Sequence, residues 1–149
     1  MELSFAERHY VETHWELLSN VVSWLRTRPN VRLAVVYGSV ARGDDRPDSD
    51  VDLLVSFARE DAHTAASLAA TLGGAMGRRV QVVSLPAATR TPLLLLDVVR
   101  EGRVLVDRDG EWPIFVRRER QLRREAAAAD AELDRRIAEL ADLVTADAG

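Results

Sequence analysis

Two carboxylates in the middle of the chain, Asp50 and Asp52, are separated by one residue at the start of an apolar run, DVDLLVSF. Side chains alternate along a strand, so both carboxylates would point to the same face. Neighbouring carboxylates raise one another's pKa unless a cation neutralises them, and hard oxygen ligands of this kind suit Mg²⁺. The spacing predicts an Mg²⁺ site. The alternative, an Asp-rich surface loop, is disfavoured because surface carboxylates rarely alternate within an apolar strand.

A glycine and a serine precede these carboxylates, with ten residues between Ser39 and Asp50. Gly38 ends a short β-rich run and removes a side chain where the backbone must approach another group closely. Ser39 follows at the start of a helical turn, where free N–H groups and a hydroxyl can hold phosphate oxygens. A phosphate cradle that faces a carboxylate metal site is the minimum equipment for phosphoryl or nucleotidyl transfer.

The only basic side chains of the chain other than histidine are arginines, because it contains no lysine. Any cationic phosphate anchor must therefore be an arginine. Arg42 and Arg46 lie between the glycine–serine pair and the carboxylates, and they are candidates to meet triphosphate oxygens. The alternative interpretation is that both side chains are simply exposed to solvent and bind no phosphate.

The elements that must position these residues alternate between strands and helices. Helices are predicted over 4–27, 61–76, 91–101 and 113–146, and strands over 32–37, 50–57, 79–85 and 103–106. Ser4 and Glu7 form a candidate capping box for the first helix. The pattern indicates one α/β (α+β) domain over residues 1–149, with a core of about 31–107 and a long helix at each end.

The composition excludes several functional classes. The chain has 149 residues, no cysteine and a net charge of −4. Disulfides and cysteine-based zinc sites are therefore excluded, and strong binding to nucleic acid is not expected. No apolar run approaches the roughly 20 residues of a membrane span, and no secretory signal is visible. A cytoplasmic protein is expected.

The segment YGSVARGDDRPDSDVDLLV resembles the nucleotidyltransferase motif of the DNA polymerase beta superfamily, and most closely that of its minimal nucleotidyltransferase (MNT) members. The resemblance covers about residues 31–107 and implies a small mixed β-sheet with helices packed on it. It also implies that Gly38 and Ser39 grip a nucleoside triphosphate, that Asp50 and Asp52 bind Mg²⁺, and that a nucleoside monophosphate passes to a hydroxyl. Either Asp-x-Asp or Gly-Ser alone would be weak evidence, but together at this spacing they are strong.

The chain departs from the family at the next strand, where active members usually carry a third carboxylate. The corresponding position is Gln81, a neutral amide that is a poor Mg²⁺ ligand and no base. The chemistry therefore either runs on two aspartates or has been lost. Asp44, Asp45 and Asp48 lie in the preceding loop and could compensate, but solvated loop charges are the favoured interpretation.

The resemblance also implies a partner. Minimal nucleotidyltransferases are often antitoxins that transfer AMP from ATP to a tyrosine of a helical HEPN toxin. The alternatives are a pseudoenzyme antitoxin that acts by binding alone, which Gln81 motivates, and, more weakly, an aminoglycoside-type small-molecule nucleotidyltransferase. That last class usually carries a sizeable additional domain.

Both terminal helices carry apolar stripes that predict contacts with another chain, including a homo-oligomer. The first stripe is Val11, Trp15, Leu18, Val22 and Leu25, and the second is Leu122, Ala126, Ala129, Leu133, Ile137, Leu140 and Val144. The first half of the second stripe is expected to pack within the chain, against the N-terminal helix. Its second half is expected to stay exposed unless another chain covers it.

Overall fold

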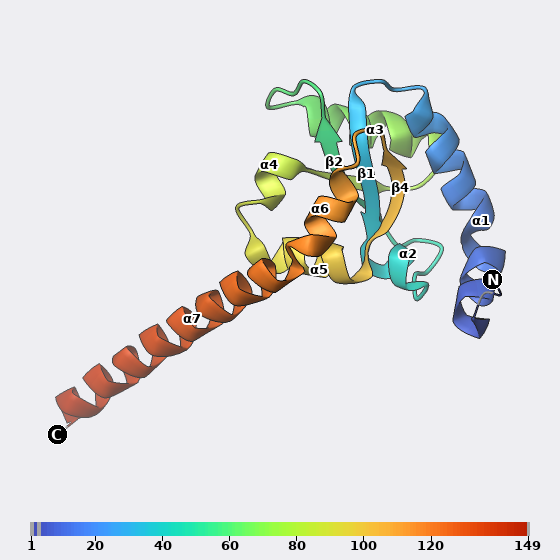
Figure 1. Ribbon diagram of the computed structural model, residues 1–149. Helices are drawn as coiled ribbons and strands as arrows, with labels where there is room; N and C mark the ends of the chain where they lie inside the picture. The colour runs from blue at the N-terminus through green and yellow to red at the C-terminus, as the bar shows by residue number, and fades with distance from the viewer. Residues whose placement is uncertain (1, 3, 149) are drawn as a thin grey trace.

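A four-stranded mixed sheet forms the centre of the computed structural model, which describes residue 2 and residues 4–148 (Figure 1). The side chains of residues 6, 9–13, 119, 147 and 148 lie outside that description. The strand order is β3-β2-β1-β4, with β1 antiparallel to both of its neighbours and β2 parallel to β3. The strands are β1 (Val31–Tyr37), β2 (Val51–Phe57), β3 (Val80–Ser84) and β4 (Arg103–Asp107). The expected mixed sheet is confirmed.

Helices cover both faces of this sheet because its central strands are apolar on both sides. Val51, Leu53 and Val55 of β2 pack with α1 (Phe5–Arg26) and α3 (Thr64–Met76). Leu54 points to the opposite cluster, which α5 (Pro92–Glu101) dominates. The remaining helices are α2 (Gly38–Arg42), α4 (Leu85–Ala88), α6 (Glu111–Arg117) and α7 (Glu119–Ala148). None of the helices in the described residues has the length and apolarity needed to cross a membrane.

The N-terminal helix begins at the predicted capping box, since the Ser4 hydroxyl accepts the Glu7 N–H and the Glu7 carboxylate accepts the Ser4 N–H. The predicted apolar stripe is wrong in part. The fully buried residues are Val21 and Leu25, whereas Trp15 is 67% exposed. The helix contacts α3 and β4, and its buried face runs through Leu18, Val21 and Leu25, so it is shifted from the predicted stripe and leaves Trp15 outside. The side chain of Val11 lies outside the described residues.

The predicted C-terminal helix is two helices, because the chain breaks between α6 and α7 at Arg118. Leu122 and Ala126 are buried, but against α5 and not against the N-terminal helix as expected. Ala129 is already exposed. Beyond it, α7 extends away from the sheet (Figure 1), and Leu133, Ile137, Leu140 and Val144 are 56–70% exposed. The second half of the stripe is therefore uncovered in the single chain.

Candidate active site

The junction between β1 and α2 brings the glycine turn against the second aspartate. Gly38 has a φ of +74°, and a Cβ at this position would lie 2.6 Å from Oδ2 of Asp52. Tyr37, the last residue of β1, pairs with Asp52 in the sheet register. Burial, together with the Asp52 charge, raises the pKa of Tyr37 to about 12, so this phenol stays protonated. The turn requires glycine both for its backbone conformation and for this close approach.

The two aspartates are close enough for the charge of Asp50 to act on Asp52, although their surroundings differ. Asp52 pairs with Gln81 across β2 and β3, and Gln81 Nε2 donates to Asp50 Oδ2 at 2.7 Å. Arg79 Nε donates to the other oxygen of Asp50 at 2.5 Å. Among the described residues, by contrast, Asp52 accepts no side-chain hydrogen bond, and its pKa is raised, first by burial and then by the charge of Asp50. Asp50 thus has a hydrogen-bonded cation, whereas among the described residues Asp52 has none, and the charge of Arg42 offsets only part of the rise in its pKa.

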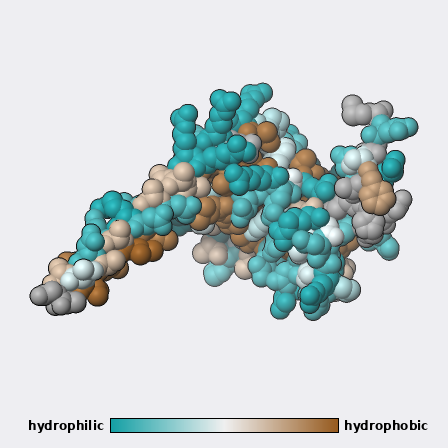
Figure 2. Space-filling model, turned by 90° about the horizontal axis from the view of Figure 1, so that it is seen from below, coloured by the Kyte–Doolittle hydropathy of each residue, from teal (hydrophilic) through white to brown (hydrophobic). Residues whose placement is uncertain are grey.

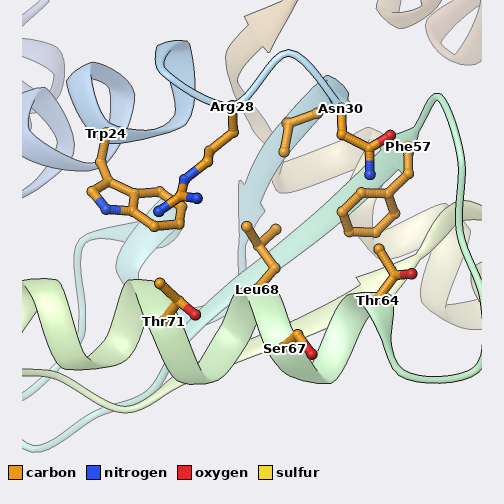
Figure 3. Close-up of a pocket in the computed structure, with 9 residues that line it drawn as sticks. Trp24, Arg28, Asn30, Phe57, Thr64, Ser67, Leu68 and Thr71 are labelled. Atoms are coloured by element: carbon orange, nitrogen blue, oxygen red, sulfur yellow. The ribbon is translucent and has the colours of Figure 1, made fainter.

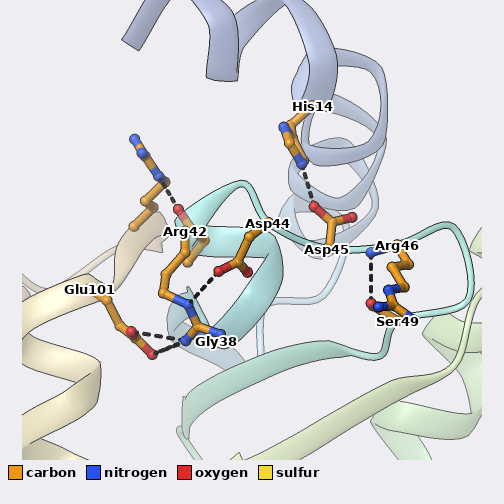
Figure 4. Close-up of polar contacts among 10 residues, drawn as sticks. His14, Gly38, Arg42, Asp44, Asp45, Arg46, Ser49 and Glu101 are labelled. Carbon is orange, nitrogen blue, oxygen red and sulfur yellow. Dashed lines mark hydrogen bonds and ion pairs between the residues drawn. The ribbon is translucent and has the colours of Figure 1, made fainter. Parts of the chain in front are cut away.

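A glutamate that the sequence reasoning missed completes the polar surroundings of α2. Glu101, the last residue of α5, accepts the Gly38 N–H at 3.1 Å and the Arg42 guanidinium at 3.1 and 3.2 Å (Figure 4). Its negative charge also contributes to the raised pKa of Asp52. Arg42 Nε meets Asp44 at 3.2 Å as well. Glu101 lies more than 45 residues after the motif, so no local pattern pointed to it.

The loop before Asp50 is more firmly held than expected. The side chain of Asp45 is only 9% exposed and bonds His14 of α1 at 2.6 Å (Figure 4). Arg78 approaches the same carboxylate at 3.5 Å and donates to the backbone carbonyl of Ser49 at 2.8 Å. The interpretation of Asp45 as a solvated loop charge is therefore wrong, because residues distant in sequence bury it.

The other loop candidates remain at the surface. Arg46 is exposed, and its backbone N–H donates to the Ser49 hydroxyl at 2.8 Å (Figure 4). Asp48 is exposed too. Arg42, with a side chain 47% exposed, is thus the arginine that the structure draws toward Gly38 through their shared partner, Glu101.

Asp50 and Asp52 could hold a metal ion only if water and substrate supplied its other ligands. No group of three or more histidine, cysteine or acidic side chains in the described part of the chain could hold a metal ion. Mg²⁺, however, commonly uses one or two protein carboxylates and completes its shell with water and substrate phosphates. The carboxylate of Asp52, whose pKa is raised by burial and by the charge of Asp50, provides that donor set together with Asp50. These two residues would hold the ion, and Gln81, which donates to Asp50, would not join them.

Two hollows of the surface lie away from the two aspartates. One of about 230 Å³ lies between the end of α1 and α3, where Arg28 stacks over the Trp24 ring at 4.3 Å (Figure 3). Another of about 450 Å³ lies between α1 and β4 and includes Arg103. Asp50 and Asp52 line neither of them. Neither of these two hollows therefore coincides with the candidate site.

Comparisons with solved structures identify the same overall fold in toxin–antitoxin complexes. A toxin–antitoxin structure with AMP-PNP matches with a TM-score of 0.65 and 24% identity, over 83% of this chain and 97% of that one. A complex of a tri-AMPylated Shewanella oneidensis HEPN toxin with its MNT antitoxin matches with a TM-score of 0.60 and 22% identity, over 83% and 94%. The MntA–HepT toxin–antitoxin structure gives 0.60 and 22%, over 83% and 95%.

Comparison of the sequence with models of protein families identifies the family of this chain. No curated protein matches the chain. The family described as polymerase beta, nucleotidyltransferase, matches residues 19–111, which is 93 of the 149 residues and includes β1, α2, β2, β3 and β4. Because this match spans more than half of the chain and includes Gly38, Asp50, Asp52, Gln81 and Glu101, the chain belongs to the polymerase beta nucleotidyltransferase family.

Proposed function

We propose that this protein is an Mg²⁺-dependent nucleotidyltransferase that moves AMP from ATP to a hydroxyl of a partner protein in the cytoplasm. The acceptor oxygen would form a bond to the α-phosphorus while the bond to the bridging oxygen of pyrophosphate breaks. The hydroxyl proton leaves to solvent, because no third carboxylate stands at Gln81. When bound, Mg²⁺ would neutralise the carboxylates and the phosphates.

One observation carries this proposal: the Asp52 carboxylate lies against the glycine turn, and burial and the charge of Asp50 raise its pKa despite the nearby charge of Arg42. A half-buried carboxylate beside a second one is costly unless a positive charge arrives. Gly38 and Ser39 would hold the triphosphate, with Arg42 and the exposed Arg46 as its cationic contacts. Asp50 and Asp52 would hold Mg²⁺ at the same edge of the sheet.

The partner that we propose is a HEPN-type toxin, and the acceptor is a tyrosine of that toxin. Solved complexes with the same fold contain a HEPN toxin, AMP-PNP or an AMPylated toxin. The protein would therefore act as the antitoxin of a toxin–antitoxin pair.

The experiment is to incubate the purified protein with α-labelled ATP and Mg²⁺, alone and with the HEPN-like protein encoded by an adjacent reading frame. Label should pass to the partner and be lost when its acceptor tyrosine is changed to phenylalanine. Repeating the reaction with EDTA should abolish the transfer. Transfer that persists in EDTA would rule out the metal role, and absence of label on any partner would defeat the enzymatic proposal.

A second candidate, a pseudoenzyme antitoxin that acts by binding alone, is favoured by a specific contact. Gln81 donates to Asp50, so a neutral amide occupies the place of the third carboxylate and satisfies one of the two that remain. In that case the protein would neutralise the toxin's activity without transferring label. An Asp52→Asn variant would then neutralise the toxin as well as the wild type does.

A further inference from the structure

The five-residue helix α2 is held at both ends by one short segment of the chain. At its start, Glu101 accepts the Gly38 N–H at 3.1 Å. At its end, Arg103 Nε donates to the backbone carbonyl of Ala41 at 2.8 Å. Glu101 and Arg103 are two residues apart, at the junction between α5 and β4. A helix of this length cannot maintain itself by its own hydrogen bonds, so these outside partners set its position.

The segment that holds α2 has little freedom to move. Gly102 lies between the two residues, and a Cβ there would meet the Val98 carbonyl at 2.2 Å and Val35 Cγ1 at 2.7 Å. Val98 and Val35 are both fully buried. The end of α5 is therefore packed directly against the central strand β1. Because this packing is tight, the backbone that carries the Glu101 side chain is held in place.

Glu101 reaches a second group on the same helix. It accepts two hydrogen bonds from Nη1 of Arg42, while Nε of that arginine meets Asp44. The side chain of Glu101 is 25% exposed, which makes its hydrogen bonds more persistent than those of a fully solvated pair. The guanidinium has five N–H donors, and these contacts use two of its three nitrogens. Within the described part of the chain, Nη2 of Arg42 has no hydrogen-bond partner and could meet a phosphate.

We propose that Glu101 is a positioning residue for the triphosphate: it holds the Gly38–Arg42 turn and orients Arg42 before nucleotide binds. The proposal rests on the nucleotide-binding role proposed above. It predicts that Glu101 acts on ATP affinity through the order of α2, without contacting the acceptor. The competing possibility is that this carboxylate occupies the place of a phosphate, and then its removal would tighten ATP binding.

The test compares Glu101→Ala and Glu101→Gln with a matched control, Asp109→Ala. Asp109 also binds an arginine through both of its oxygens, Arg32 at 2.6 and 2.9 Å, but at the opposite end of β1. ATP affinity is measured with Mg²⁺ by calorimetry, and the backbone amides of residues 38–42 are followed by hydrogen exchange. In labelling assays, KM for ATP and KM for the acceptor are measured separately.

Glu101→Ala should weaken ATP binding by roughly tenfold or more, as expected for the loss of charge-assisted hydrogen bonds, and should speed exchange at residues 38–42. Glu101→Gln should lose less, since its amide oxygen can still accept the Gly38 N–H. Asp109→Ala should change neither quantity, and KM for the acceptor should be the same in all variants.

Unchanged or tighter ATP binding in Glu101→Ala would overturn the proposal, and so would weaker binding with unchanged exchange. Failure of the proposed function has a different signature: the wild type itself would then bind no ATP. That result would overturn the positioning role as well, whereas ATP binding by the wild type that Glu101→Ala leaves unchanged would overturn the positioning role alone.

Discussion

Two regions differ in which side chains they bury: the end of the sheet with Gly38, Asp50 and Asp52, called the site edge, and the part of α7 beyond Ala129, called distal α7. The first partly buries charged groups, and the second exposes apolar ones. At the site edge, charged groups are partly buried and nearly all have partners: Asp50 has Arg79 and Gln81, and Arg42 has Glu101. In distal α7, apolar side chains such as Leu140 are exposed, and the ion pairs among its described residues join neighbours one turn apart, as in Arg135 with Glu139.

This difference teaches where a substitution should matter. A polar group that is partly removed from water depends on its partners, so changes at the site edge should have large effects. Exposed ion pairs on a helix contribute little, and apolar side chains that stay wet contribute nothing to the stability of the single chain. Distal α7 can become important only when another chain covers it.

The largest effect is expected for Asp50→Asn and Asp52→Asn, which should each abolish nucleotide transfer. Both remove a carboxylate of the proposed Mg²⁺ site, and neither should unfold the protein. Asp52→Asn should even raise the melting temperature in EDTA, because it removes the charge that Asp50 and Glu101 oppose. Label transfer and thermal melting, side by side, check both claims. Wild-type transfer by Asp52→Asn would remove this edge from the active site.

Gln81→Glu should raise transfer if the missing third carboxylate limits the reaction. General-base assistance is typically worth about 10²–10⁴-fold, so even partial restoration would be measurable. The new charge would lie beside Asp50, and so the variant should be less stable than the wild type in EDTA and recover with Mg²⁺. Gln81→Asn serves as the neutral control. A wild-type rate that the substitution leaves unchanged would show that no base is needed at this position.

Gly38→Ala should cost about 1–3 kcal/mol of folding free energy, since a non-glycine residue at positive φ is strained and its Cβ would overlap the Asp52 carboxylate. Urea unfolding measures the loss. Gly77→Ala is a matched control: it also has a positive φ, +65°, but no atom lies within 4 Å of its added Cβ. Equal losses in both variants would mean that the close approach to Asp52 adds nothing.

The pH dependence of stability in EDTA should reveal the raised pKa of Asp52. The folded state holds this proton more tightly than the unfolded state, whose value is near 3.8. The stabilising contribution is therefore complete below pH 3.8 and is lost as the pH rises through the folded-state pKa. Relative to Asp52→Asn, the wild type should lose stability over that window and then level off. A difference in stability that stays constant across the window would contradict the shift.

The smallest effect on the single chain is expected for distal α7. Leu140→Ala should change the free energy of unfolding by less than about 0.5 kcal/mol. Leu122 is only 2% exposed and packs against α5, so Leu122→Ala should cost about 2–5 kcal/mol.

Deleting the residues after Leu133 should leave the fold intact. It should change the mass of the assembly that light scattering measures for the protein alone or with its partner. The interface prediction fails if neither the mass nor the affinity for the partner changes.

Local patterns were enough to predict the strands, the capping box and the helix that the structure has over 92–101, because backbone preferences act between residues close in sequence. The spacing of Gly38–Ser39 and Asp50–Asp52 was likewise enough to nominate these residues as a candidate site. Only the tertiary structure decided which polar groups become buried together. Glu101 reaches Gly38, and His14 reaches Asp45, through packing of helices on a sheet whose strand order no local pattern encodes. The same packing chose the buried face of α1. It also left distal α7 uncovered, since periodicity predicts an apolar stripe but not the surface that meets it.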